Sequence, residues 1–368
     1  MLDAKLPEIH PDFKLNGEHL EVKDMYPVCY SFVKEGKAYE ELLGNFLLDW
    51  LNESYETIKL RTSGTTEAPK EIFVEREKMV ASANFTAETF KLLPKSRVLC
   101  CIPANNVAGR MMLIRAMVLG WHLDLVEPKV KALDEVTKKY NFCALTPLQL
   151  SNSLHKLHLI EKVIVGGAPV SLHLKKALVG RSTKVYETFG MTETISHVAY
   201  RRINSRKKEK SNPNFKAIGD VQFSVDKRSC LIIHSEKLLD KSLVTNDIVD
   251  LIDETHFVWK GREGNLINSG GVKIHPEEVE KKIEPLINSE FIIASKEDKH
   301  LGEKLILIVK NYKGIPSSEE LEKNIKALKT ITKFEVPKEI HFVDEFERTR
   351  TKKIDRKASV EALFSLVK

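Results

Sequence analysis

Residues 184–194 read KVYETFGMTET, a short strand-like run that ends in a loop rich in hydroxyl and acidic side chains. Similar runs lie upstream, and stretches with helical spacing separate them, such as residues 78–93, whose apolar side chains would share one face. Strands that alternate with helices predict an α/β fold with a largely parallel sheet. Ligands bind such sheets at the carboxyl ends of the strands, where these polar loops fall. The upstream runs are RVLCCI (97–102), HLDLV (122–126), FCALT (142–146) and KVIVGG (162–167).

The character of the sequence changes at residues 259–271, WKGREGNLINSGG, where glycine and asparagine cluster. Helix and strand patterns typical of a compact α+β unit follow this cluster. We therefore expect two domains, residues 1–262 and residues 263–368, with a hinge near Asn265.

A helix is expected to begin at Pro276, because proline fits the first helical position and the two glutamates after it favour the helix N-terminus. Strand-like runs then follow at residues 290–295 and 304–310. The apolar stripe of the helix would comprise Val279, Ile283, Leu286 and Ile287.

Composition limits the class of protein. With 42% hydrophobic residues among 368, the chain can bury a sizeable core, and it contains no run of 18 apolar residues that would predict a membrane span. The first residues, MLDAKLPEIHPDF, lack the apolar segment of a secretory signal. The five cysteines show no CxxC spacing, so we expect reduced core thiols in a cytoplasmic protein.

The net charge of +6 suits an anionic ligand without requiring one. The densest basic cluster is RRINSRKKEK, residues 201–210, and no aromatic residue interrupts it. A surface that binds nucleic acid combines basic residues with aromatic side chains. We therefore interpret this cluster as a solvated loop and expect no nucleic-acid partner.

A hydroxyl-rich stretch, TSGTTEAPK at residues 62–70, is the first candidate site. Hydroxyls and the backbone N–H groups around Gly64 can surround phosphate oxygens, and Lys70 adds positive charge. The same composition also occurs in an ordinary polar turn.

Three further motifs each have a plain and a functional interpretation. In residues 186–194, Glu193 is either a solvated carboxylate or a ligand for Mg²⁺ on a polyphosphate. Asp247 and Arg262 are either surface charges or a pair that binds the hydroxyls of a ribose. The stretch ERTRTKKIDR, residues 347–356, is either a basic loop or a source of one mobile lysine.

The four motifs, together with GREGNLINSGGVKIHPEEVE at residues 261–280, occur in an order and at a spacing that resemble the adenylate-forming superfamily of acyl-CoA synthetases, adenylation domains and luciferases. The resemblance implies an α/β fold with a large N-terminal domain that binds ATP and the acid, and a small, mobile α+β lid. It also implies ATP, Mg²⁺ and coenzyme A as ligands. Members join a carboxylate to ATP with release of pyrophosphate, and most then pass the acyl group to a thiol.

The resemblance assigns nucleotide-binding residues by matched position. Six residues would line the polyphosphate: Thr62, Ser63, Gly64, Thr65, Thr66 and Lys70. Five residues would border the adenine, with the ring of Phe189 stacked on it: Gly166, Gly167, Ala168, Phe189 and Gly190.

The remaining assignments concern catalysis and the lid. Thr192 and Glu193 would meet the phosphate and Mg²⁺, Asp247 and Arg262 would hold the ribose, and Lys353 would be the catalytic lysine of the adenylation step. Three residues would belong to a loop that replaces Lys353 at the site when the lid rotates for thioester formation: Gly270, Gly271 and Lys273.

The sequence departs from the family pattern in several places. Glu67 stands where a second glycine is usual, Lys352 where glycine is usual, and Asn265 where aspartate is common. Asn106 stands where many relatives have a histidine or an aromatic residue. Only 61 residues precede the phosphate loop, so we expect an N-terminal domain that is shortened at its beginning.

The acid is indicated by residues 103–121, where two arginines, Arg110 and Arg115, interrupt an apolar helix. Either arginine points to solvent, or one of them binds a second carboxylate on the substrate. The segment resembles o-succinylbenzoate–CoA ligases of menaquinone biosynthesis, which have a basic residue at the position of Arg115. The resemblance implies an acyl site formed by Arg115, Arg110, Asn106, Ser196 and His197.

Three alternatives stay open at this point: another aryl- or acyl-CoA ligase, an adenylating enzyme that loads a carrier protein, and a non-catalytic nucleotide-binding relative. The expected partners are the acid, ATP and CoA, and a homodimer is possible.

Overall fold

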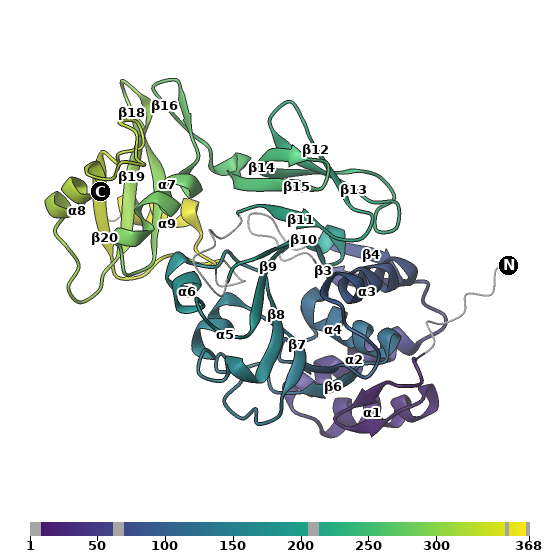
Figure 1. Cartoon of the computed structure of the whole chain (residues 1–368). Helices are drawn as coiled ribbons and strands as arrows, with labels where there is room; N and C mark the ends of the chain where they lie inside the picture. The colour runs from purple at the N-terminus through teal and green to yellow at the C-terminus, as the bar shows by residue number, and fades with distance from the viewer. Residues whose placement is uncertain (1–8, 62–69, 205–212, 350–352, 366–368) are drawn as a thin grey trace.

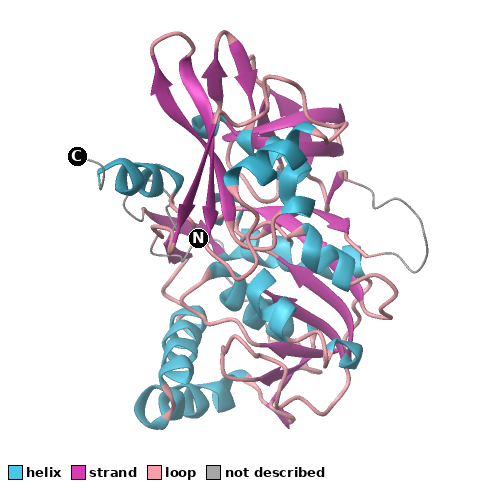
Figure 2. Ribbon diagram, turned by 90° about the vertical axis from the view of Figure 1, so that its left-hand side faces the viewer, coloured by secondary structure: helices cyan, strands magenta, loops and turns pink. Residues whose placement is uncertain are grey.

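The computed structural model describes residues 9–61, 70–204, 213–349 and 353–365, and in this part of the chain it contains a 13-stranded sheet, a five-stranded sheet and a two-stranded hairpin. Figure 1 shows the smaller sheet, in green to yellow, beside α6 and β9 of the larger one. In Figure 2, long strands rise at the top of the view, and helices surround the strands below them.

One half of the large sheet is parallel. Each of its strands is followed by a polar loop or by a helix that covers the sheet, as the alternating pattern predicted. The strands lie in the order β9 (Lys184–Gly190), β8 (Ile160–Val165), β7 (Tyr140–Leu145), β5 (Arg97–Cys100), β6 (His122–Leu125) and β1 (Lys14–Leu15), with β2 (Glu18–His19) antiparallel at the edge. The helices between them are α3 (Arg76–Phe90), α4 (Val107–Leu119), α5 (Pro147–Asn152) and α6 (Leu172–Ala177), with a short 3-10 turn at Leu157–Leu159.

The other half of the large sheet is antiparallel, so the expectation of a largely parallel sheet holds only as far as β9. A parallel crossover needs about a dozen residues. The connection from β9 to the next strand, residues 191–196, is too short for one, and the chain turns back beside β9. These strands lie in the order β10 (His197–Arg202), β11 (Phe215–Ala217), β15 (His256–Arg262), β14 (Leu243–Asp253), β13 (Cys230–His234) and β12 (Gln222–Val225).

The N-terminal residues form a helical pair, α1 (Val22–Glu35) and α2 (Ala38–Leu51), and then the hairpin of β3 (Thr57–Arg61) and β4 (Glu71–Glu75). Apolar side chains from α2 and α3 pack against the large sheet, and the predicted face of α3 is confirmed by the burial of Met79, Ala83 and Phe90. All five cysteines are buried and unpaired, as expected of core thiols. Among the described residues, no helix is long and apolar enough to cross a membrane.

The small sheet has its own apolar core, which includes Val279, Ile283, Leu305 and Leu307. Its strands are β17 (Val272–Ile274), β16 (Ile267–Ser269), β19 (Gly302–Lys310) and β18 (Phe291–Asp298), with β20 (Glu339–Val343) parallel to β19; its helices are α7 (Pro276–Ile283), α8 (Ser318–Lys326) and α9 (Arg356–Ser365). The last strand of the large sheet ends at Arg262 and the first strand of the small sheet begins at Ile267. The division into domains at residues 262 and 263 stays a prediction.

The helix predicted from Pro276 begins at that residue, but the expectation that its stripe continues to Ile287 was wrong. α7 ends at Ile283, and a 3-10 turn, Glu284–Leu286, follows. Pro285 explains the end, because proline disfavours the helical conformation in the residue before it and has no N–H to donate. Leu286 and Ile287 still pack against the same core from the turn.

Candidate active site

Two glycine-bearing loops meet at the carboxyl ends of β8 and β9, where the sequence placed the adenine. Gly166, Gly167 and Ala168 follow β8, and Gly190 ends the neighbouring strand β9. A Cβ on Gly190 would lie 2.3 Å from the carbonyl oxygen of Ser196, which is closer than real contacts allow. Glycine at this position lets the chain after β9 return tightly beside it.

Phe189 is half-buried in a group of aromatic rings. Its ring centroid lies 5.2 Å from that of Phe257 and 5.8 Å from that of Phe215. The part of the ring that stays exposed offers an apolar surface at the same strand ends as Gly166–Ala168, as stacking on a base requires.

The motif after β9 forms a one-turn 3-10 helix, Thr192–Thr194, in which Thr192 is buried and Glu193 is exposed. The hydroxyl of Thr194 donates to backbone oxygens of Met191 and Ser196, at 2.9 and 2.8 Å, and so holds the turn. No ion pair involves Glu193 in the described part of the chain. Its carboxylate therefore fits the role of a Mg²⁺ ligand, since this ion prefers carboxylate oxygens and phosphates.

Asp247 and Arg262 face each other across the β14–β15 pair, where their Cα atoms are in register. The Nε of Arg262 lies 3.4 Å from Oδ1 of Asp247, which is buried, while Arg262 is exposed. Trp259 contacts the same oxygen: its indole N–H donates to Oδ1 at 2.8 Å. The second oxygen of the carboxylate, Oδ2, can accept from ribose hydroxyls. The sequence did not indicate Trp259, because its contact with Asp247 depends on the register of two antiparallel strands.

Lys353 comes to this pair from the far end of the chain. Burial lowers the pKa of its ammonium group, and Arg262 lowers it further, while Asp247 opposes both effects. Both residues predicted to hold the ribose thus lie within electrostatic range of this lysine.

The other predicted lid residues lie in the β16–β17 hairpin of the small sheet. Gly270 and Gly271 have positive φ values of 60° and 82° at its tip, and the N–H of Gly270 donates to the carbonyl of Leu301 at 2.8 Å. Lys273 is exposed on β17. The charges of Asp247 and Arg262 thus act on Lys353, whereas the hairpin residues lie at the tip of the β16–β17 hairpin and on β17 (Figure 1).

The phosphate loop lies outside the described residues, and so does Lys352. The predicted loop residues concerned are Thr62, Ser63, Gly64, Thr65, Thr66 and Glu67. β3 and β4 bring its two ends together, with Arg61 opposite Glu71. Glu71 pairs with Lys59 at 2.7 Å and with Arg61 at 3.3 Å. Lys70 is exposed at the start of β4.

Arg115 is buried in the middle of α4, with 1% of its surface exposed. Its Nη2 donates to the hydroxyl of Ser196 at 2.7 Å, and its Nε has no partner among the described residues. Within the described part of the chain, no carboxylate pairs with it. Burial lowers the pKa of Arg115 to about 9, so the group is still charged at neutral pH. A buried cation without a counter-ion is costly and suits an anionic ligand.

His197 completes this group. Its Nδ1 lies 3.4 Å from the Ser196 hydroxyl, and no described residue pairs with its buried Nε2. Burial, with a smaller contribution from Arg115, holds the pKa of His197 well below its usual value, so the imidazole is neutral. Phe90 on α3 packs against the imidazole with 5.9 Å between ring centroids. The sequence placed Phe90 only on the apolar face of its helix, since an apolar residue on a helix is usually part of a core.

The structure separates the two arginines of α4. Arg110 donates to the carbonyl oxygens of Ala104, at 2.7 Å, and Lys59, at 2.6 Å, and its guanidinium lies over the ring of Phe46. Five helical residues correspond to a rotation of about 140°, so the two side chains leave the helix in different directions. The structure therefore groups Arg115, and not Arg110, with Ser196 and His197. Asn106 is exposed at the N-terminus of α4.

Comparison with known proteins identifies the family. Residues 60–225 match the model of the AMP-binding enzymes. A solved acyl-CoA synthetase (AMP-forming)/AMP-acid ligase II-like protein from Dyadobacter fermentans DSM 18053 is 32% identical, with a TM-score of 0.59, and the match covers 92% of this chain and 98% of that one. The chain belongs to the AMP-binding enzyme family. The matched segment contains the phosphate loop, the loop after β8 and the β9 motif, whereas Asp247, Arg262 and Lys353 follow it.

Other AMP-binding enzymes are similar over most of the chain. A 2-succinylbenzoate–CoA ligase from Listeria monocytogenes serotype 4b (strain F2365) is 26% identical over 338 residues, which cover 84% of this chain and 71% of the relative. The o-succinylbenzoate coenzyme A synthetase (MenE) of Bacillus subtilis, solved in complex with ATP and magnesium ion, is 20% identical with a TM-score of 0.71; the match covers 82% of this chain and 69% of that one. This likeness confirms the expected adenylate-forming fold.

Proposed function

We propose that this chain is an AMP-forming acid–CoA ligase that converts o-succinylbenzoate to o-succinylbenzoyl-CoA, a reaction of menaquinone biosynthesis. Family membership and the names of several similar proteins support this proposal. The observation that carries it is the buried Arg115, whose charge no described carboxylate balances and which lies beside two polar residues, Ser196 and His197.

In the first half-reaction, the succinyl carboxylate attacks the α-phosphorus of ATP, and pyrophosphate leaves as the P–O bond to the β-phosphate breaks. The protein's task is to position the reactants and to offset the negative charge that develops. Asp247 accepts hydrogen bonds from the ribose, and Lys353 supplies positive charge beside it. Glu193 would hold Mg²⁺, which neutralises phosphate charge when bound. Lys70 and the loop before it would hold the β- and γ-phosphates.

In the second half-reaction, the thiol of CoA attacks the acyl carbon and AMP leaves. Lys353 has no role in this step. The family resemblance implies that the lid rotates about a hinge near Asn265 and brings Gly270, Gly271 and Lys273 to the site. We assign the arrangement in the structure, with Lys353 within electrostatic range of Asp247 and Arg262, to the adenylation half-reaction.

The second carboxylate of the substrate explains why a buried arginine is useful. A guanidinium binds a carboxylate through charge-assisted hydrogen bonds, and Arg115 has an unused Nε donor. Ser196 and the neutral His197 can add hydrogen bonds to the same group. An acid with one carboxylate would leave Arg115 buried and unpaired, so its binding would be penalised.

Pyrophosphate release tests the proposal. The purified protein is incubated with ATP, Mg²⁺ and CoA and is offered o-succinylbenzoate, benzoate, coumarate or octanoate. We expect CoA-dependent turnover with o-succinylbenzoate alone. Turnover with another of the acids would favour a different acyl-CoA ligase. Adenylate formation without use of free CoA would favour an enzyme that loads a carrier protein, and ATP binding without release would favour a non-catalytic relative.

A further inference from the structure

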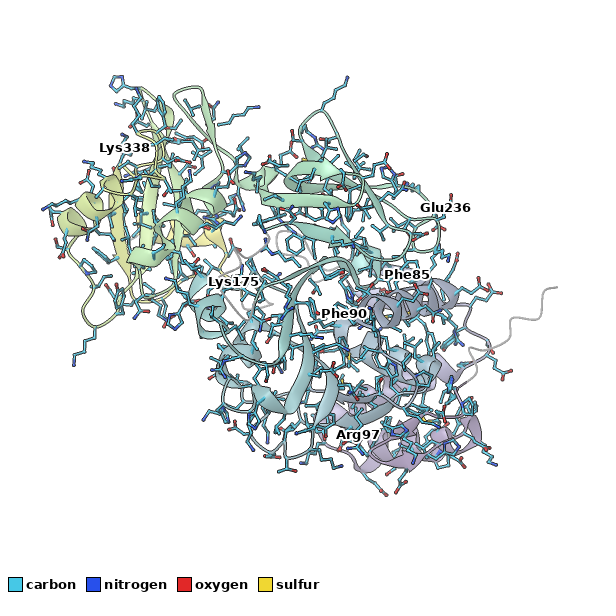
Figure 3. The ribbon with its side chains drawn as sticks, in the orientation of Figure 1. Phe85, Phe90, Arg97, Lys175, Glu236 and Lys338 are labelled. Carbon is cyan, nitrogen blue, oxygen red and sulfur yellow. The ribbon has the colours of Figure 1, made fainter. Side chains whose placement is uncertain are left out.

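Glu187 is a buried carboxylate on β9 to which the proposed mechanism gives no role; 4% of its surface is exposed. It has four polar contacts. Oε1 accepts from the backbone N–H of Val170 at 3.0 Å. Oε2 accepts from Nε and Nη2 of Arg201 at 2.9 and 2.7 Å and lies 3.2 Å from Nζ of Lys175. Figure 3 shows Lys175 on α6, where that helix faces the small sheet.

The Oε1 contact reaches the loop on one side of the predicted adenine site. Val170 lies two residues after Ala168, and its N–H is buried with the carboxylate. The bond therefore fixes the exit of Gly166–Ala168 relative to β9. At its entrance the loop is held by the N–H of Gly166, which donates to the carbonyl of Leu145 at 3.3 Å.

The Oε2 contact reaches the other side of the same site. The guanidinium of Arg201 lies over the ring of Phe215, 4.3 Å from its centroid, and Nη1 donates to the carbonyl of Pro213 at 2.7 Å. The Phe215 ring packs in turn against Phe189, the residue expected to stack on adenine. Glu187 thus connects the loop and the stacking ring through one side chain.

The carboxylate is ionised in this environment. Burial by itself raises the pKa of Glu187, but Arg201 and Lys175 outweigh burial and hold the pKa of this carboxyl below its usual value. A buried ion pair whose donors and acceptors are satisfied keeps its geometry rigid, because movement would expose an unpaired charge to an apolar interior.

We propose that Glu187 is a positioning residue that sets base selectivity, by holding the loop 166–168 and the Phe189 ring at the separation that fits adenine. This inference rests on the nucleotide site of the proposed function. It concerns Glu187 and Arg201, to which no step of the proposed reaction gives a role. It predicts that loss of the charge on Glu187 widens the range of accepted bases rather than only weakening the fold.

The test measures binding of ATP and of GTP, each with Mg²⁺, by calorimetry on the whole chain. Glu187→Gln keeps an oxygen for the Val170 N–H but removes the charge that orients Arg201. We expect ATP binding to weaken about tenfold and GTP binding to change much less, so that the preference for ATP falls. Arg201→Lys keeps the positive charge but loses the paired hydrogen bonds and the contact with Phe215. We therefore expect the preference for ATP over GTP to fall in this variant too.

Glu280 provides a matched control. It also accepts from one backbone N–H, that of Ile293 at 2.7 Å, and from one arginine, Arg356 at 2.5 Å. Unlike Glu187, it lies on α7, a helix that belongs with the small sheet. Glu280→Gln should leave the ratio of ATP to GTP affinity unchanged. The inference is overturned if Glu187→Gln and Arg201→Lys weaken both nucleotides equally or leave both unchanged, or if Glu280→Gln alters the ratio as much.

These readouts separate the inference from the proposed function. Binding requires no acid and no CoA, so a protein that binds ATP but releases no pyrophosphate would contradict the ligase and still allow selectivity to be measured. A ligase that works on o-succinylbenzoate and keeps its full ATP preference in both variants would contradict only the role of Glu187.

Discussion

Arg115 combines a cost in stability with a gain in function. A buried charge that lacks a counter-ion carries a desolvation penalty of several kcal/mol, which an apolar side chain of similar length does not have. We therefore expect Arg115→Met to raise the melting temperature of the ligand-free protein by a few degrees, since about 1 kcal/mol corresponds to roughly 2–4 °C in a domain of this size. Thermal unfolding followed by circular dichroism measures this. A lower melting temperature would mean that a carboxylate already pairs with Arg115.

Trp259 should matter through a single hydrogen bond. Trp259→Phe removes the N–H that donates to Asp247 but keeps an aromatic ring. We expect the affinity for ATP to fall several-fold and the affinity for 2′,3′-dideoxy-ATP, which lacks the ribose hydroxyls, to change little; a typical hydrogen bond to a charged group is worth about 1.5–3 kcal/mol. Trp121→Phe is the control, because the buried N–H of Trp121 has no partner in the part of the chain that the structure describes. Equal losses for both nucleotides would place Trp259 outside ribose recognition.

The pH dependence of adenylation should report on Lys353. The protonated lysine supplies the positive charge, and burial together with Arg262 lowers its pKa below the usual 10.5. As the pH rises, the rate of adenylation at low ATP should therefore decline at a lower pH than the usual pKa of lysine would give. Lys353→Arg should move this decline to higher pH. Stopped-flow measurement of pyrophosphate release across pH 7–10 tests this expectation. An identical decline in both proteins would assign it to another group.

Residue types within one motif could be predicted from the sequence, whereas partners across strands could not. Asp247 and Arg262 were identified, but Trp259 requires knowledge of which residues face each other in β14 and β15. Arg115 and Arg110 look equivalent in the sequence, and only the direction of each side chain from α4 distinguishes them.

At the scale of elements, the interpretation of residues 201–210 as a solvated loop was wrong at its beginning. β10 continues through Arg202, Ile203 and Asn204 are buried, and Arg201 pairs with Glu187. Residues 205–210 lie outside the described part. A run of basic residues resembles a surface loop, and only the antiparallel return of β10 beside β9 brings Arg201 next to a buried carboxylate.

The contact between α6 and the small sheet should favour adenylation. The N–H of Leu172, at the start of α6, donates to the carboxylate of Glu284 at 2.5 Å. Glu284→Ala leaves this N–H without its acceptor. Removing an acceptor at the N-terminus of a helix typically costs about 1 kcal/mol. We expect adenylation to slow by roughly fivefold, while transfer from preformed adenylate to CoA is spared. Single-turnover assays of the two half-reactions measure this, and equal slowing of both would show that the contact does not select one arrangement of the lid.

At the scale of the whole molecule, the order of the motifs indicated the adenylate-forming fold before any element was placed, and the structural likeness to known members confirms it. The parallel strands could be predicted because each apolar run ends in a loop. The antiparallel half could not, because its strands carry few signals of their pairing. The sequence also does not say which arrangement the small sheet adopts relative to the large one.

The measurement to make first compares kcat/KM for two acids in two proteins. The acids are o-succinylbenzoate and 3-benzoylpropionate, which carries the same reactive carboxylate but lacks the one on the ring; the proteins are the natural chain and Arg115→Met. If Arg115 binds the ring carboxylate, the natural chain prefers the diacid by about 100-fold or more, and the variant loses most of this preference by failing with the diacid alone. If the substitution lowers kcat/KM equally for both acids, Arg115 does not recognise the second carboxylate, and the proposed substrate loses its structural support.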